Sequence, residues 1–150
     1  MLHVLCRVGG DAYAIPASAV ERVIPCAALK GLPGATHGLA GLLNYQGSSV
    51  PVVDLSLALT GTPARELLST RILLCPLEES PTGRLGLLVE SVSRTVQLAE
   101  SDFKPAGASG AEFLDGVAGS GAELLQRIEV PRILPDGLLV SLGLSSERAE

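Results

Sequence analysis

Few residue types able to carry out covalent or metal chemistry are present in this chain. Its two histidines are His3 and His37, and its three cysteines are Cys6, Cys26 and Cys75. Nucleophilic catalysis needs a serine or cysteine beside a base that a third group orients. His3 and Cys6 stand three residues apart in a segment that alternates like a strand, so their side chains leave opposite faces. We therefore predict no catalytic dyad here, and no enzyme.

The remaining candidates for chemistry favour structural roles. His37 lies in a glycine-rich loop, where a solvated side chain is expected and a ligand-binding or pH-sensing role is the alternative. The cysteines are isolated in apolar segments, without the three or four spaced ligands of a metal site, so we expect no metal and no cofactor. The glycine-rich residues 116–121 lack a following lysine and favour a hairpin turn over a phosphate loop. The Glu78–Glu79 pair is expected to be exposed charge.

Composition excludes several classes of protein. The 150 residues are 47% hydrophobic, 18% charged and 3% aromatic, with a net charge of −5. This apolar content argues against disorder. Scarce aromatics and scattered cations argue against single-stranded or duplex nucleic acid as a partner. We expect a single domain, residues 1–150, with a sizeable core.

The cysteine count and the absence of long apolar runs predict the compartment. The odd number of cysteines and the lack of a C-x-x-C pair favour free thiols in a reducing environment. The first residues do not resemble a signal peptide, and no apolar run approaches the ~18 residues that span a bilayer. We therefore expect a soluble cytoplasmic protein without direct membrane insertion.

Short strands must position these residues, because glycine and proline together interrupt the chain every few residues. Period-two alternation predicts strands at residues 2–8 and 94–98, and β-branched residues before a proline predict an extended segment at 22–25. Further strands are predicted at residues 12–15, 71–77, 84–92 and 124–130. Residues 101–121 are predicted to be mostly loop, anchored by Phe103 and Phe113. Residues 132–144 are predicted to contain a short amphipathic helix. Nine or ten strands without an evident internal repeat predict a closed or nearly closed β-barrel architecture.

Two local signals are more specific. Residues 38–55, GLAGLLNYQGSSVPVVDL, form two apolar runs around a turn and predict a hairpin, with Pro51 placing its second strand at an edge or a bulge. Asp54 is predicted to cap a short helix that follows it. Ser18 and Glu21 match the spacing of a capping box, which predicts one helical turn.

The hairpin segment resembles the signature of the CheW-like chemotaxis coupling proteins. Other landmarks of that family follow in order: YAIP at 13–16, LP at 32–33, GLLVESV at 86–92 and FLDGV at 113–117. The resemblance implies a mainly β, CheW-like fold of two five-stranded SH3-like β-barrel lobes around a shared hydrophobic core, with short helices.

The resemblance also implies function. Family members are non-catalytic adaptors that couple the cytoplasmic tip of a methyl-accepting chemoreceptor to the regulatory domain of a CheA-type histidine kinase. Receptor helices would dock in a groove between the lobes, and the kinase domain would pair barrel end to barrel end. The implied receptor-binding residues are Val20, Arg22, Gly41, Asn44 and Gln46. The implied kinase-binding residues are Val53, Leu55 and Leu57, and we expect Leu57 to be exposed.

This chain departs from the family at one charged pair. The signature arginine falls on Gln46, and the glutamate that often faces it falls on Arg22. Glu21 would restore the carboxylate only through a one-residue slip, which in a strand turns a side chain to the other face. An unpaired Arg22 would accept a carboxylate from the receptor; alternatively, Arg22 is solvated and Gln46 only completes the turn.

These departures leave the pathway open, and a non-flagellar system for surface sensing or pilus motility fits as well as flagellar chemotaxis. A protein of another class remains the alternative. In that interpretation the chain is a regulatory β-barrel that binds a small ligand between its lobes, with His37 and Tyr45 lining the pocket.

Overall fold

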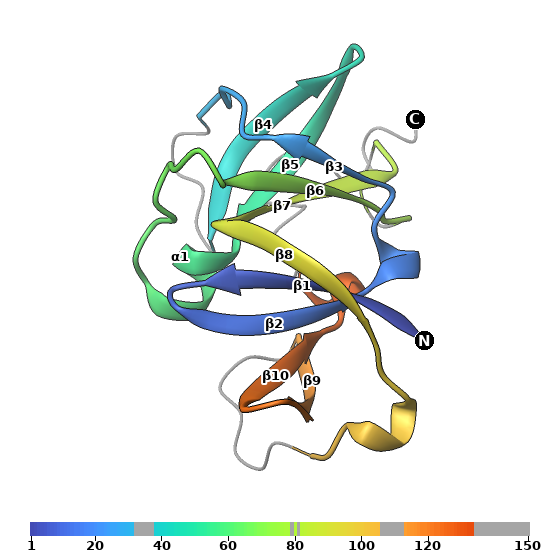
Figure 1. The fold of residues 1–150 in the computed structure, drawn as a ribbon. Coiled ribbons are helices and arrows are strands. Elements are labelled where there is room, and N and C mark those ends of the chain that lie inside the picture. Colours follow the sequence, from blue (N-terminus) through green and yellow to red (C-terminus); the bar gives the residue numbers. More distant parts are fainter. Residues whose placement is uncertain (32–37, 79, 81, 106–112, 134–150) are drawn as a thin grey trace.

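The computed structural model describes residues 1–31, 38–78, 80, 82–105 and 113–133. In this part of the chain ten strands form two five-stranded sheets stacked one above the other (Figure 1). His37, Glu79 and most of the predicted helix at 132–144 lie outside the described residues.

The first sheet is formed by both ends of the described chain. Its order is β8-β1-β2-β10-β9, with β2 and β10 parallel and the other pairs antiparallel. The strands are β1 (Leu2–Val8), β2 (Asp11–Pro16), β8 (Ser91–Gln97), β9 (Leu114–Ser120) and β10 (Glu123–Ile128).

The second sheet contains the middle of the chain. Its order is β3-β6-β7-β5-β4, with β5 and β7 parallel and the other pairs antiparallel. The strands are β3 (Arg22–Pro25), β4 (Leu39–Tyr45), β5 (Ser48–Asp54), β6 (Arg71–Pro76) and β7 (Arg84–Val89). The predicted hairpin at residues 38–55 is confirmed as β4 and β5.

Helices in the described part of the chain are short. They are α1 (Leu55–Thr60) and the 3-10 turns η1 (Ala17–Ala19), η2 (Glu100–Asp102) and η3 (Val130–Arg132). Asp54 caps α1 as predicted, since its side chain accepts the N–H of Leu57 at 3.2 Å. The capping box predicted at Ser18 is wrong: the N-cap of η1 is Pro16, two residues earlier, and it makes no side-chain cap. None of these helices is long and apolar enough to cross a membrane.

The two edges of each sheet are joined by one isolated bridge. Lys30, beyond β3, exchanges two backbone hydrogen bonds with Leu42 of β4, at 2.9 and 2.8 Å. Lys104, beyond β8, exchanges two with Val117 of β9, at 2.8 and 2.9 Å. Each bridge covers backbone groups that an open edge would expose.

The two sheets repeat one arrangement, although no repeat is evident in the sequence. They share the same strand order and the same parallel and antiparallel pairs, with β8, β9, β10, β1 and β2 corresponding to β3, β4, β5, β6 and β7. The N–H of Asp54 donates to Gly38 O at 2.7 Å, and the N–H of Glu129 donates to Phe113 O at 2.7 Å. Residues in one sheet therefore have defined counterparts in the other.

Three apolar clusters are formed by the residues that the structure describes. The largest lies between the sheets and includes Cys6, Ile15, Leu73 and Leu87. One smaller cluster lies within the first sheet around Leu125, and another within the second sheet around residues 43, 50, 52, 72, 74 and 88. Successive residues of a central strand thus alternate between the core that the two sheets share and the smaller apolar cluster of their own sheet.

Strand β9 corrects the prediction of a loop at residues 101–121. The segment is poor in β-formers, but β9 pairs with β10 through Leu114, Val117, Ala118, Gly119 and Ser120. Pairing to a neighbour in the fold thus overrides weak local propensity. The prediction of one strand over 84–92 is also wrong, because the chain leaves β7 at Val89 and begins β8 at Ser91.

The prediction of an edge position for the strand carrying Pro51 is wrong as well. β5 lies between β4 and β7. Its ladder with β7 begins at Val52, so Pro51 pairs with Leu42 of β4 and precedes the β7 ladder. A residue without an N–H is tolerated there because no donor toward β7 is required. A bulge does interrupt the β4–β5 register, between Leu39 and Gly41.

Candidate functional site

The residues predicted to bind a receptor divide between a sheet edge and a hairpin tip. Val20 and Arg22 flank the start of β3, and Arg22 is exposed. Asn44 and Gln46 lie at the exposed end of the β4–β5 hairpin. Among the described residues, no hydrogen bond or ion pair joins Arg22 to Gln46.

The hairpin tip is fixed by its own backbone. Gln46 has φ +51° and Gly47 has φ +86°, the left-handed conformations that a tight two-residue turn requires. The side-chain oxygen of Asn44 accepts the N–H of Gly47 at 3.1 Å. Gln46 and Gly47 therefore form the turn, the Asn44 side chain holds it, and the side chain of Gln46 extends from it.

Gly41 has a structural role. It is buried, it has φ +149°, and a Cβ placed on it would lie 2.5 Å from Lys30 O. Only glycine permits this approach of the strand β4 to the bridge at Lys30. Gly41 thus holds the two edges of the second sheet together and offers no side chain to a partner.

A charged cluster that sequence reasoning missed lies beside these residues. Arg84, the first residue of β7, donates from Nε and Nη2 to the two carboxylate oxygens of Glu21 at 2.9 and 3.0 Å. Its guanidinium carbon lies 5.3 Å from the ring centre of Tyr45, the last residue of β4. The hydrogen bond from Arg84 lowers the pKa of Glu21. We call Glu21, Arg84 and Tyr45 the Arg84 cluster.

The alternation argument does not apply to Glu21, because this residue precedes the strand β3. β3 begins at Arg22, and the Glu21 N–H donates to Leu74 O at 2.7 Å outside the β3–β6 ladder. Strand alternation does not dictate the side-chain direction of a residue outside the strand. A glutamate immediately before Arg22 was the only local sign of an ion pair at this place, and the sequence could not identify its partner, Arg84, which lies 63 positions away.

Of the residues predicted to bind a kinase, only Leu57 reaches the surface. Val53 and Leu55 are 1% and 0% exposed and belong to the core between the sheets. Leu57 is half-buried, not exposed as expected, and lines a groove of about 840 Å³. Leu67 and the fully exposed Leu68 lie on the same groove.

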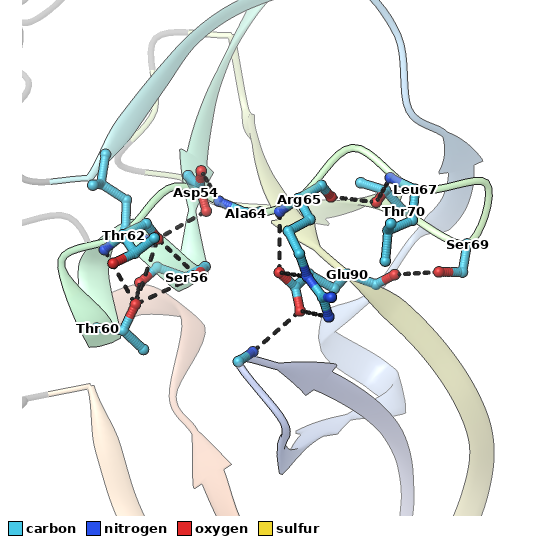
Figure 2. Close-up of polar contacts among 12 residues, drawn as sticks. Asp54, Ser56, Thr60, Thr62, Ala64, Arg65, Leu67, Ser69, Thr70 and Glu90 are labelled. Atoms are coloured by element: carbon cyan, nitrogen blue, oxygen red, sulfur yellow. Dashed lines mark hydrogen bonds and ion pairs between the residues drawn. The ribbon is translucent and has the colours of Figure 1, made fainter.

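Two buried carboxylates hold the segment that carries Leu67 and Leu68, as Figure 2 shows. Asp54 accepts the N–H of Ala64 at 2.9 Å, in addition to its cap on α1. Glu90 accepts the N–H of Arg65 at 3.0 Å, and its own carbonyl oxygen accepts the Ser69 hydroxyl at 2.8 Å. Residues 61–70 form no helix or strand, and the two carboxylates instead accept backbone N–H groups of this segment.

Glu90 also connects the two sheets. Its carboxylate accepts the N–H of Gly9, in the β1–β2 turn, at 3.3 Å. Together with the N–H and guanidinium of Arg65, this contact lowers the pKa of Glu90, although burial opposes it. Gly9, Arg65 and Glu90 line a second cavity of about 460 Å³ with Thr60. Tyr45 lines neither of these two cavities.

Two of the three cysteines are inaccessible in the core, whereas Cys26 is exposed just beyond β3. Cys6 and Cys75 are fully buried, and burial raises the pKa of both thiols to about 12. The described residues include no group of three or more side chains placed to hold a metal ion. His3 is buried beside Phe103, with ring centres 5.2 Å apart, and its Nδ1 lies 3.1 Å from Met1 O.

Comparison with known proteins bears on the whole chain. Residues 2–137 match a family model described as a CheW-like domain. The structure is similar to the crystal structure of the scaffolding protein TtCheW from Thermoanaerobacter tengcongensis, with a TM-score of 0.80, 18% identity, and coverage of 91% of this chain and 89% of that chain. No curated protein sequence matches.

Proposed function

Because this chain belongs to the CheW-like domain family, we propose that it couples methyl-accepting chemoreceptors to a CheA-type histidine kinase. The chain is a CheW-like scaffold of chemotaxis signalling, and such scaffolds are non-catalytic. The observation that carries the proposal is the extent of the match, which includes both sheets and the core between them. An adaptor needs two separate surfaces on one rigid body.

The two proposed surfaces lie on the second sheet. The receptor surface is formed by Val20 and Arg22 at the start of β3 and by Asn44 and Gln46 at the hairpin tip. The kinase surface is the groove that Leu57 lines, with Leu67 and Leu68 beside it. Buried Val53 and Leu55 act indirectly, by fixing the end of β5 and the start of α1.

The proposed location follows from the partners. The protein works in the cytoplasm and is recruited to the inner face of the membrane by the receptors it binds. The replacement of the family's charged pair by Arg22 and Gln46 supports a specialised receptor, such as that of a surface-sensing or pilus pathway.

Size-exclusion chromatography tests the proposal. The chain is mixed with a chemoreceptor signalling hairpin and with the regulatory domain of a CheA-type kinase, both from the source organism. Co-elution with each partner supports the adaptor. A ligand-binding β-barrel would instead give a thermal shift with a small metabolite and no co-elution, and this result would overturn the proposal.

A further inference from the structure

The Arg84 cluster has the geometry of a prepared recognition site. The Glu21 carboxylate accepts two hydrogen bonds, of 2.9 and 3.0 Å, from one edge of the Arg84 guanidinium. The centre of the Tyr45 ring lies 5.3 Å from the guanidinium carbon. The side chains of Arg84 and Glu21 are 32% and 34% exposed. The guanidinium is therefore held in one orientation while remaining accessible from solvent.

Part of the hydrogen-bonding capacity of Arg84 is unused. An arginine has five N–H donors, and Glu21 takes one from Nε and one from Nη2. Within the described part of the chain, Nη1 of Arg84 makes no hydrogen bond. A guanidinium with one edge held and the other open can receive a second carboxylate.

The repeated architecture shows that the fold does not need this cluster. On β6, Leu74 faces Arg22 of β3; on β1, the counterpart Leu5 faces Arg94 of β8. Both arginines are exposed. Along the same register, Glu21 corresponds to Ser93 of the first sheet, Arg84 to Ala12, and Tyr45 to Ser120. The first sheet therefore folds without any ion pair or ring at these positions.

Local charge identifies the chemistry of the partner. Arg22 lies next to Glu21 and helps to lower its pKa, although the hydrogen bond from Arg84 is the main cause. Two arginines and one glutamate leave a net charge of +1 at this place, on a chain whose net charge is −5. A local excess of positive charge on an acidic protein favours an acidic partner.

We propose that Arg84, positioned by Glu21 and Tyr45, binds an aspartate or glutamate side chain of the chemoreceptor tip. The inference rests on the proposed function and refines it, because Glu21 and Tyr45 adjoin the residues of the proposed receptor surface. Glu21 and Tyr45 are positioning residues. Arg22 contributes to the local field, and Arg84 makes the contact.

The test measures binding of the chain to the receptor signalling hairpin and, separately, to the kinase regulatory domain. Arg84→Glu is expected to weaken receptor binding about tenfold or more at low salt, because it places a carboxylate opposite the acidic side chain of the receptor. The loss should shrink as salt rises. Kinase binding should not change. Arg84→Lys keeps the charge but loses the paired geometry, so its receptor affinity should fall between those of wild type and Arg84→Glu.

Arg94→Glu is the matched control, since it makes the same charge change on an exposed strand of the first sheet. It should leave receptor binding unchanged. Folding is monitored by circular dichroism, and Arg84→Lys provides a variant expected to fold normally. Equal receptor affinities for wild type and Arg84→Glu would overturn the inference while leaving the adaptor role intact. Equal losses with Arg84→Glu and Arg94→Glu, or a parallel loss of kinase binding, would also overturn it. If the wild type binds no receptor hairpin, both the inference and the proposed function fail.

Discussion

The carboxylate of Glu90 and the backbone N–H of Gly9 form a 3.3 Å hydrogen bond between the two sheets. The same carboxylate accepts two donors from the guanidinium of Arg65, at 3.3 and 3.4 Å. Glu90 is only 6% exposed, so these contacts replace water around a charged group. One side chain thus fixes both the segment 61–70 and the position of one sheet against the other.

Replacing Glu90 with glutamine should destabilise the protein by about 1 kcal/mol near neutral pH. The amide keeps the shape but weakens charge-assisted hydrogen bonds, and the high exposure of Arg65 keeps the cost at the lower end. Chemical denaturation measures the change. Glu66→Gln, an exposed carboxylate in the same segment, is the control and should have no effect. Equal effects of the two substitutions would show that the Glu90 carboxylate does not stabilise the contact between segment 61–70 and the two sheets.

The contribution of Glu90 should depend on pH. Its folded pKa is lowered, chiefly by the N–H of Arg65, so its stabilisation is present above the unfolded pKa of about 4.3 and is lost as pH falls through the folded value. The difference in unfolding free energy between wild type and Glu90→Gln should be largest at about pH 7 and small at about pH 3. A difference that stays constant over this range would contradict the assignment.

Gly41→Ala should destabilise the second sheet by about 2 kcal/mol or more, because a Cβ would lie 2.5 Å from Lys30 O in a backbone conformation that favours glycine. Gly119→Ala, in the corresponding strand of the first sheet, meets nothing within 4 Å and should change stability by less than about 0.5 kcal/mol. Thermal unfolding of the two variants measures the contrast. Comparable losses for both would show that the bridge at Lys30 does not depend on glycine.

Leu57→Glu should weaken kinase binding about tenfold or more if the groove is the kinase surface, because it places a charge in an apolar contact. Leu124 provides the matched control: it is 72% exposed on β10, and Leu124→Glu should leave kinase affinity unchanged. Since Leu57 is half-buried, a melting curve must accompany the binding measurement. A folded Leu57→Glu protein with wild-type kinase affinity would place the kinase surface elsewhere.

The sequence predicted the local features well because their causes are local. The hairpin at 38–55 and the Asp54 cap depend on turn-forming and capping residues within a few positions. The resemblance to the CheW-like family is confirmed by the match over residues 2–137, and the mainly β fold by the structural similarity.

The features that were missed depend on distant parts of the chain. Strand β9 is glycine-rich and gains its order from β10 and from the bridge to Lys104. The pairing of Glu21 with Arg84 requires β7 to start beside the short link between the end of η1 and the start of β3, which no local pattern specifies. The structural repeat is not evident in the sequence, because the first sheet takes its strands from both ends of the chain and few residues are identical between corresponding strands.

The measurement that tests the adaptor role most directly is kinase autophosphorylation in the presence of receptor. Full-length CheA-type kinase and membranes containing the receptor are assayed with and without this chain. The account predicts that receptor-dependent control of autophosphorylation appears only when the chain is added, and that the chain alone has no phosphotransfer activity. Receptor control of the kinase that is equally strong without the chain would contradict the account.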